Sequence, residues 1–75
     1  MSQNELSDEY RIRIAKAIRA ATNDAKNLLA VLERADYAAI SGSAGFLRRD
    51  LETADRITLD LSRAANELMK LANEL

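Results

Sequence analysis

The chain has 75 residues, a length that fits one small domain with a single hydrophobic core. It contains no cysteine, histidine, tryptophan or proline. The lack of cysteine excludes disulfides, thiolate metal sites and thiol nucleophiles. With 11 basic and 12 acidic residues the net charge is −1, which argues against a strongly electrostatic attachment to nucleic acid or anionic lipid.

The N-terminal region carries many charges and predicts a soluble protein. Its charged side chains within the first twenty residues are Glu5, Asp8, Glu9, Arg11, Arg13, Lys16 and Arg19. They leave no apolar core for a signal peptide, and no run in the chain approaches the length of a membrane span. Because a chain without cysteine also suits a reducing compartment, we expect a cytoplasmic protein.

The first helix is expected to begin at Ser7. Residues 2–5 have the spacing of a capping box and offer an earlier start, but Ser7 is followed by Asp8 and Glu9, which the helix dipole favours in a first turn. Nothing then breaks a helix before the segment Ser41-Gly42-Ser43-Ala44-Gly45. We expect a helix over about residues 8–40, a loop over 41–45 with Ser43 as the next cap, and a helix over about 46–74.

Apolar residues recur at alternating steps of four and three in both halves of the chain, which is typical of amphipathic helices. The first set is Ile14, Ile18, Ala21, Ala25, Leu28, Leu32, Ala35 and Ala39, and the second is Leu47, Leu51, Ala54, Thr58, Leu61, Ala65, Leu68, Ala72 and Leu75. Two such helices joined by a short loop must pack antiparallel. The prediction is an all-α helical hairpin, one domain over residues 1–75, in which residues whose numbers sum to about 86 lie side by side.

The apolar stripes are wider than one seam between two helices requires. Ala17, Val31 and Ala38 widen the first stripe, and Ile57, Ala64 and Leu71 widen the second. A second copy would cover this surplus and form an antiparallel four-helix bundle with two-fold symmetry. We therefore expect a homodimer whose interface includes Val31, Ile57, Ala64 and Leu71. A long leucine-rich helix of another protein would fit as well.

Larger apolar residues near the loop predict a docking patch for another protein. Tyr37, Ile40 and Phe46 fall off the stripes, and aromatic residues dominate binding hot spots. Local capping of the bundle end is the alternative. The leading hypothesis is a small non-enzymatic interaction protein without a cofactor, such as an adaptor, a secretion co-chaperone, or a regulatory inhibitor of the kind that phages and plasmids encode.

A basic stripe supports a second hypothesis, a nucleic-acid-binding regulator. Its members are Arg13, Lys16, Arg19 and Lys26, which share the outer face of the first helix. Paired stripes in a dimer could span phosphates, and the hairpin-dimer architecture resembles ROP, the plasmid RNA-binding hairpin dimer. Acidic residues on the second helix, Asp60, Glu67 and Glu74, should offset this field. A solvated charged face is the simpler interpretation.

Two acid pairs suggest a third hypothesis, a magnesium-dependent enzyme. Glu33 with Asp36 and Glu52 with Asp55 stand at i, i+3 in two similar segments that should face each other. This arrangement loosely resembles all-helical nucleotide pyrophosphatases, although Leu32 replaces an acidic residue of their pattern. Because the two segments also repeat a packing pattern, we expect neither a metal site nor an enzyme.

Overall fold

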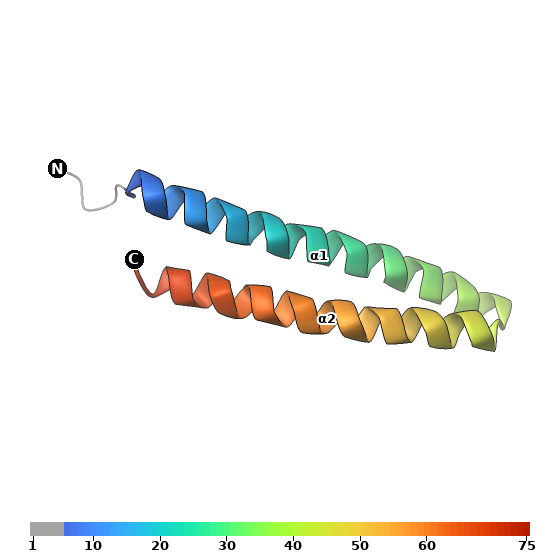
Figure 1. Cartoon of the computed structure of the whole chain (residues 1–75). Coiled ribbons are helices and arrows are strands. Elements are labelled where there is room, and N and C mark those ends of the chain that lie inside the picture. The colour runs from blue at the N-terminus through green and yellow to red at the C-terminus, as the bar shows by residue number, and fades with distance from the viewer. Residues whose placement is uncertain (1–5) are drawn as a thin grey trace.

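The protein is an antiparallel hairpin of two α-helices, and its computed structural model describes residues 6–75 (Figure 1). Helix α1 spans Asp8–Ser41 and helix α2 spans Ala44–Ala72. The molecule measures 61 × 15 × 14 Å. The predicted all-α hairpin is therefore confirmed. The turn is shorter than predicted, because α2 already begins at Ala44 and includes Gly45.

The ends of α1 show how local sequence sets the helix bounds. The side-chain oxygen of Ser7 accepts a hydrogen bond from the backbone N–H of Tyr10 at 3.1 Å, which confirms the predicted start. The capping box predicted for residues 2–5 lies outside the described residues. At the other end Gly42 adopts a left-handed conformation with φ of 74°, which closes the helix. The backbone N–H groups of Gly42 and Ser43 donate to the carbonyls of Ala39 and Ala38.

Ser43 does not cap α2 in the way the sequence predicted. Its side chain makes no capping hydrogen bond, whereas its carbonyl accepts the backbone N–H of Leu47 at 2.9 Å. The turn has room for two residues between the helices, so Ser43 serves both as the end of the α1 closure and as the start of α2. Because this turn is short, the last turn of α1 lies alongside the first turn of α2.

The two helices bury one stripe each against the other, and these stripes form the helix seam. Among residues 6–75 five are buried, namely Val31, Ala35 and Ala38 of α1 and Ala54 and Leu71 of α2. Most of the half-buried residues continue the same spacing of four and three: Tyr10, Ile14, Ala17, Ala21, Asp24 and Leu28 in α1, and Leu47, Asp50, Ile57, Leu61, Ala64 and Leu68 in α2. Ala15, Ser43 and Thr53 are half-buried beside this stripe. Three of the five buried residues are alanines, which lets the helices approach closely, whereas most of the larger seam side chains stay half-buried.

The seam is rotated relative to the predicted one. Half of the first predicted stripe lies in it and the other half is exposed, namely Ile18, Ala25, Leu32 and Ala39. Four of the nine residues of the second predicted stripe lie in it, and the other five are exposed: Leu51, Thr58, Ala65, Ala72 and Leu75. Their places are taken by residues predicted to flank the stripe. Both faces share the spacing of four and three, so the periodicity alone did not separate them, and the observed seam also includes Asp24 and Asp50.

This rotation corrects the predicted dimer interface. Leu71 retains 1% of its accessible surface and Val31 retains 7%, both within a single chain. Ile57 and Ala64 are half-buried at seam positions. All four residues therefore pack inside the hairpin, and the surplus apolar surface lies on the other half of the predicted stripes.

Candidate interaction surfaces

The hairpin has two flanks, one on each side of the helix seam, and their side chains differ in kind. Positions seven residues apart share a flank in such a pair. The ion-paired flank comprises Arg13, Ala20, Asn27, Arg34 and Ser41 of α1, and Phe46, Thr53, Asp60, Glu67 and Glu74 at and beyond α2. The apolar flank comprises Ile18, Ala25, Leu32 and Ala39 of α1, and Leu51, Thr58, Ala65 and Ala72 of α2.

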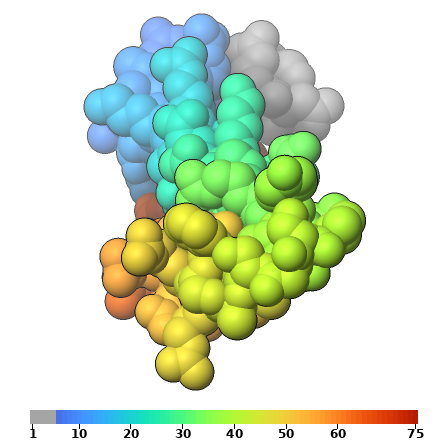
Figure 2. Space-filling model, turned by 90° about the vertical axis from the view of Figure 1, so that its right-hand side faces the viewer, coloured from blue at the N-terminus to red at the C-terminus, as the bar shows by residue number. Residues whose placement is uncertain are grey.

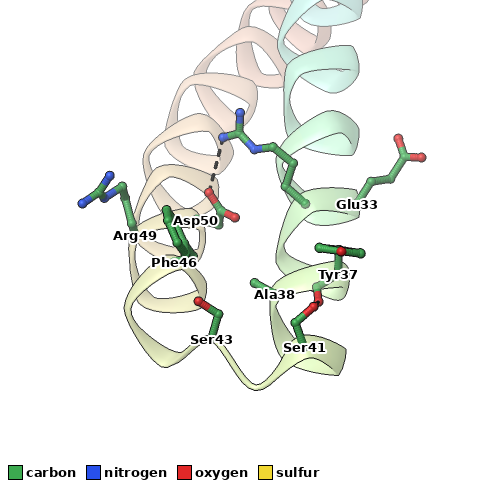
Figure 3. A pocket seen from close by; sticks show the side chains of 9 residues that line it. Glu33, Tyr37, Ala38, Ser41, Ser43, Phe46, Arg49 and Asp50 are labelled. Carbon is green, nitrogen blue, oxygen red and sulfur yellow. Dashed lines mark hydrogen bonds and ion pairs between the residues drawn. The ribbon is translucent and has the colours of Figure 1, made fainter.

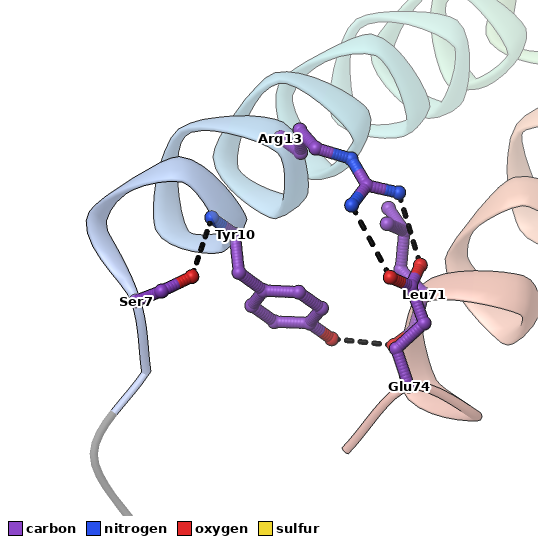
Figure 4. A network of polar contacts seen from close by, with 5 residues as sticks. All are labelled: Ser7, Tyr10, Arg13, Leu71 and Glu74. Atoms are coloured by element: carbon purple, nitrogen blue, oxygen red, sulfur yellow. Dashed lines mark hydrogen bonds and ion pairs between the residues drawn. The ribbon is translucent and has the colours of Figure 1, made fainter.

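Polar contacts join the two helices at the open end of the ion-paired flank (Figure 4). The guanidinium of Arg13 donates to both carboxylate oxygens of Glu74, at 3.2 and 2.9 Å. This hydrogen-bonded carboxylate raises the pKa of Arg13 above its ordinary value. Beside it the Tyr10 hydroxyl donates to the backbone carbonyl of Leu71 at 2.6 Å. The Arg13–Glu74 pair agrees with the predicted pairing of residues whose numbers sum to about 86, whereas the long side chain of Tyr10 reaches Leu71, a pair whose numbers sum to 81.

A second ion pair crosses the helices near the turn. The guanidinium of Arg34 lies 3.3 Å from the carboxylate of Asp50 (Figure 3). Only 13% of the Asp50 side chain is exposed, because this residue occupies a seam position. Arg34 therefore supplies the counter-charge that a carboxylate in the seam requires.

An open groove lies between the helices at the turn, on the ion-paired flank, and we call it the tip groove. Figure 2 looks onto this end of the hairpin, and Figure 3 shows the lining side chains. Its volume is about 930 Å³. The lining residues are Glu33, Arg34, Tyr37, Ala38, Ser41, Ser43, Phe46, Arg49 and Asp50.

The tip groove presents two aromatic rings to solvent. Tyr37 of α1 is 75% exposed and Phe46 of α2 is 63% exposed. The guanidinium carbon of Arg49 lies 5.9 Å from the centroid of the Phe46 ring, within the range of a cation–π contact. The structure thus brings two of the three predicted docking residues to one groove. Ile40 is highly exposed but does not line it.

Three residues of the tip groove were not singled out from the sequence: Arg34, Arg49 and Asp50. The sequence did contain a sign of two of them. Asp50 is a carboxylate within a series of apolar residues spaced by four and three, and the predicted pairing of the helices places Arg34 opposite it. Arg49 carried no comparable signal, because its position is explained only by the Phe46 ring beside it.

The apolar flank lies on the other side of the seam and exposes large aliphatic side chains. Ile18 and Leu51 are each 49% exposed and Leu32 is 45% exposed. The residues between them on this flank are alanine and threonine, so the surface is flat. Exposed apolar residues that form one continuous stripe indicate an association surface more strongly than scattered ones do.

The basic stripe is only partly available for a nucleic acid. Lys16, Arg19 and Lys26 are exposed on the outer side of α1. Arg13 instead reaches across to α2 and pairs with Glu74, one of the acids that the sequence predicted to offset the basic field. The four residues therefore do not act as one unit.

The described part of the chain shows whether the acid pairs could hold a metal ion and whether a helix could cross a membrane. Within residues 6–75, no three histidine, cysteine, aspartate or glutamate side chains gather at a spacing that suits a metal ion. Glu33, Asp36, Glu52 and Asp55 are all exposed there. Neither of the two described helices contains a stretch that is both long enough and apolar enough to cross a membrane.

Comparison with known proteins found no matching family model and no similar curated protein or solved structure. The function must therefore be inferred from the surfaces of this chain alone.

Proposed function

We propose that the protein is a small non-enzymatic protein–protein interaction module that works as a dimer of hairpins and binds another protein at the tip groove. The observation that carries this proposal is the exposure of Tyr37 and Phe46 on one groove. Aromatic side chains are costly to leave in water and dominate the energy of protein interfaces. An adaptor, a co-chaperone or a regulatory inhibitor would use such a surface.

The chemistry of the tip groove suggests what a partner segment would offer. An apolar side chain would enter between the two rings, over the buried Ala38. A carboxylate on the same segment would lie near Arg49, whose guanidinium stands at the Phe46 ring. Arg34 is already paired with Asp50, so Arg49 is the basic group best placed to contact a partner.

The proposal is tested by affinity capture from the native host, followed by titration of the captured protein against purified variants. Truncation of a hot-spot aromatic costs about 2 kcal/mol or more, so Phe46→Ser and Tyr37→Ser should each weaken binding by about thirtyfold. Ile40→Ser is the matched control, because it removes an equally exposed apolar residue of α1 outside the groove. It should leave the affinity unchanged.

Two results would contradict the proposal. Unchanged binding by both aromatic variants would mean that the tip groove is not the docking surface. Capture of RNA or DNA, weakened steeply by salt and by Lys16→Glu with Arg19→Glu and Lys26→Glu, would support the nucleic-acid alternative instead.

A further inference from the structure

The outer side of α1 carries a second stripe with the spacing of a helix seam. It continues the apolar flank outward and comprises Arg11, Ala15, Ile18, Thr22, Ala25, Leu29, Leu32 and Asp36, which we call the α1 outer stripe. Its large members are strongly exposed, with Leu29 at 60%. Steps of four and three between apolar residues are the pattern by which a helix packs against another helix. Helix α2 does not cover this stripe.

Two copies of the α1 outer stripe are complementary in side-chain size when they run antiparallel. If two copies run antiparallel, Ile18 lies opposite Leu29, Ala15 opposite Leu32, and Thr22 opposite Ala25. The Ile18–Leu29 level brings two large side chains together, and the Ala15–Leu32 level brings a small one against a large one. The pair of smaller residues, Thr22 and Ala25, lies at the two-fold axis. Alternation of this kind allows side chains to interdigitate without voids.

The same alignment places opposite charges at both ends of the stripe. Arg11 of one copy comes opposite Asp36 of the other, and two-fold symmetry repeats the pair. Arg11 now lies 3.4 Å from Asp8, and its side chain is 65% exposed, so it has room to contact a second carboxylate. A parallel alignment would instead place like charges at the same level, which is unfavourable.

The surface area of the hairpin matches what a dimer requires. The chain exposes 6127 Å², whereas a compact monomer of 8.3 kDa exposes about 4,600 Å². The excess of about 1,500 Å² exceeds the roughly 800 Å² that each partner buries in an interface of standard size. Helix α2 can contribute on the same side, since Leu51 and Met69 are exposed there at 49% and 61%.

We propose that two copies of this chain associate through the α1 outer stripe and the apolar flank, with the two α1 helices antiparallel and Arg11 of each copy paired with Asp36 of the other. This proposal rests on the dimer in the proposed function and names its surface. Because the tip groove lies on the opposite, ion-paired flank, both grooves remain accessible in such a dimer. A partner could then bind at each end of the assembly.

The oligomeric state of the purified full chain, measured by sedimentation equilibrium over a wide range of concentration, tests the surface. The natural chain should be a dimer. Leu32→Glu should raise the dimer dissociation constant at least about a hundredfold, because two unpaired carboxylates would be buried. Leu32 is half exposed in the hairpin, so the helices should remain folded by circular dichroism. Ala20→Glu, on the ion-paired flank, is the matched control and should remain dimeric.

A charge exchange tests the antiparallel orientation. Arg11→Asp alone and Asp36→Arg alone should each weaken the dimer by up to about tenfold, since each places two like-charged pairs at the interface. The double variant should restore the natural affinity. Oxidation of Thr22→Cys with Ala25→Cys should give a covalent dimer, because these positions meet at the two-fold axis, whereas Ala20→Cys with Asn27→Cys should not.

A monomeric natural chain at all concentrations would overturn the proposal, and so would a dimer unaffected by Leu32→Glu. Failure of the double charge variant to recover would overturn the antiparallel pairing. None of these results bears on binding at the tip groove, which Phe46→Ser tests separately. A monomeric chain would also remove the dimer from the proposed function, whereas docking at the tip groove can hold or fail independently of the dimer surface.

Discussion

The two flanks of the hairpin have the same backbone geometry but opposite chemistry. On the ion-paired flank, Arg13 and Arg34 reach across the seam to Glu74 and Asp50. On the apolar flank the corresponding positions hold alanine, threonine, leucine and isoleucine, which leave the surface flat. A two-helix protein can therefore satisfy one side of its seam with its own ion pairs while the other side stays apolar and exposed.

The seam between the flanks should carry most of the stability, and Leu71 provides the largest test of this. Leu71→Ala removes the most deeply buried large side chain and should lower the free energy of unfolding by about 2 to 5 kcal/mol. Urea denaturation followed by circular dichroism measures this change. Leu59→Ala, the same substitution at a residue of α2 that is 57% exposed outside both flanks, should have a much smaller effect. Equal effects would show that the seam is not where the structure has it.

A bulky residue in the seam should have the next largest effect. Ala35 is buried where the helices approach closely, so Ala35→Phe should overpack the seam and destabilise the fold by about 1 to 3 kcal/mol. Ala20→Phe adds the same ring to an exposed position on the ion-paired flank and should leave the stability nearly unchanged. A tolerated Ala35→Phe would indicate that the helices pack through another face.

The dependence of thermal stability on salt should distinguish the two flanks, and it is the smallest effect that we predict. Arg13→Gln removes an exposed, bidentate ion pair, so we expect a small decrease in Tm at low ionic strength that disappears in concentrated salt. The core of the apolar flank carries no charge, and the association that we propose there should persist in concentrated salt. A large, salt-independent decrease in Tm for Arg13→Gln would mean that this residue has another structural role.

The sequence predicted the helices, the turn and the antiparallel pairing because each depends on local signals. Ser7 caps α1, and Gly42 adopts the left-handed conformation that ends it. Apolar residues spaced by four and three over a long run are typical of a helix and of no other regular structure. The predicted docking residues Tyr37 and Phe46 also lie together, since both stand close to the turn. Ile40 does not line the same groove, because it lies on the outer side of α1.

The rotation of the helices could not be predicted from the same pattern. Each helix carries apolar residues at three positions in seven, so two neighbouring stripes shared the same spacing and the periodicity did not distinguish them. In the structure the seam includes Asp50, and the guanidinium of Arg34 on the other helix lies 3.3 Å from its carboxylate. A charge that is costly when considered alone becomes acceptable when a residue of the other helix reaches it.

The sequence by itself determined that this protein is a helical hairpin with more apolar surface than one seam can bury, because hydrophobic periodicity and capping act over a few residues. Tertiary structure alone decided which stripe fills the seam and which remains exposed, because that choice depends on contacts between residues far apart in the chain. It thereby moved Val31 and Leu71 into the hairpin and left Ile18 and Leu32 on its surface.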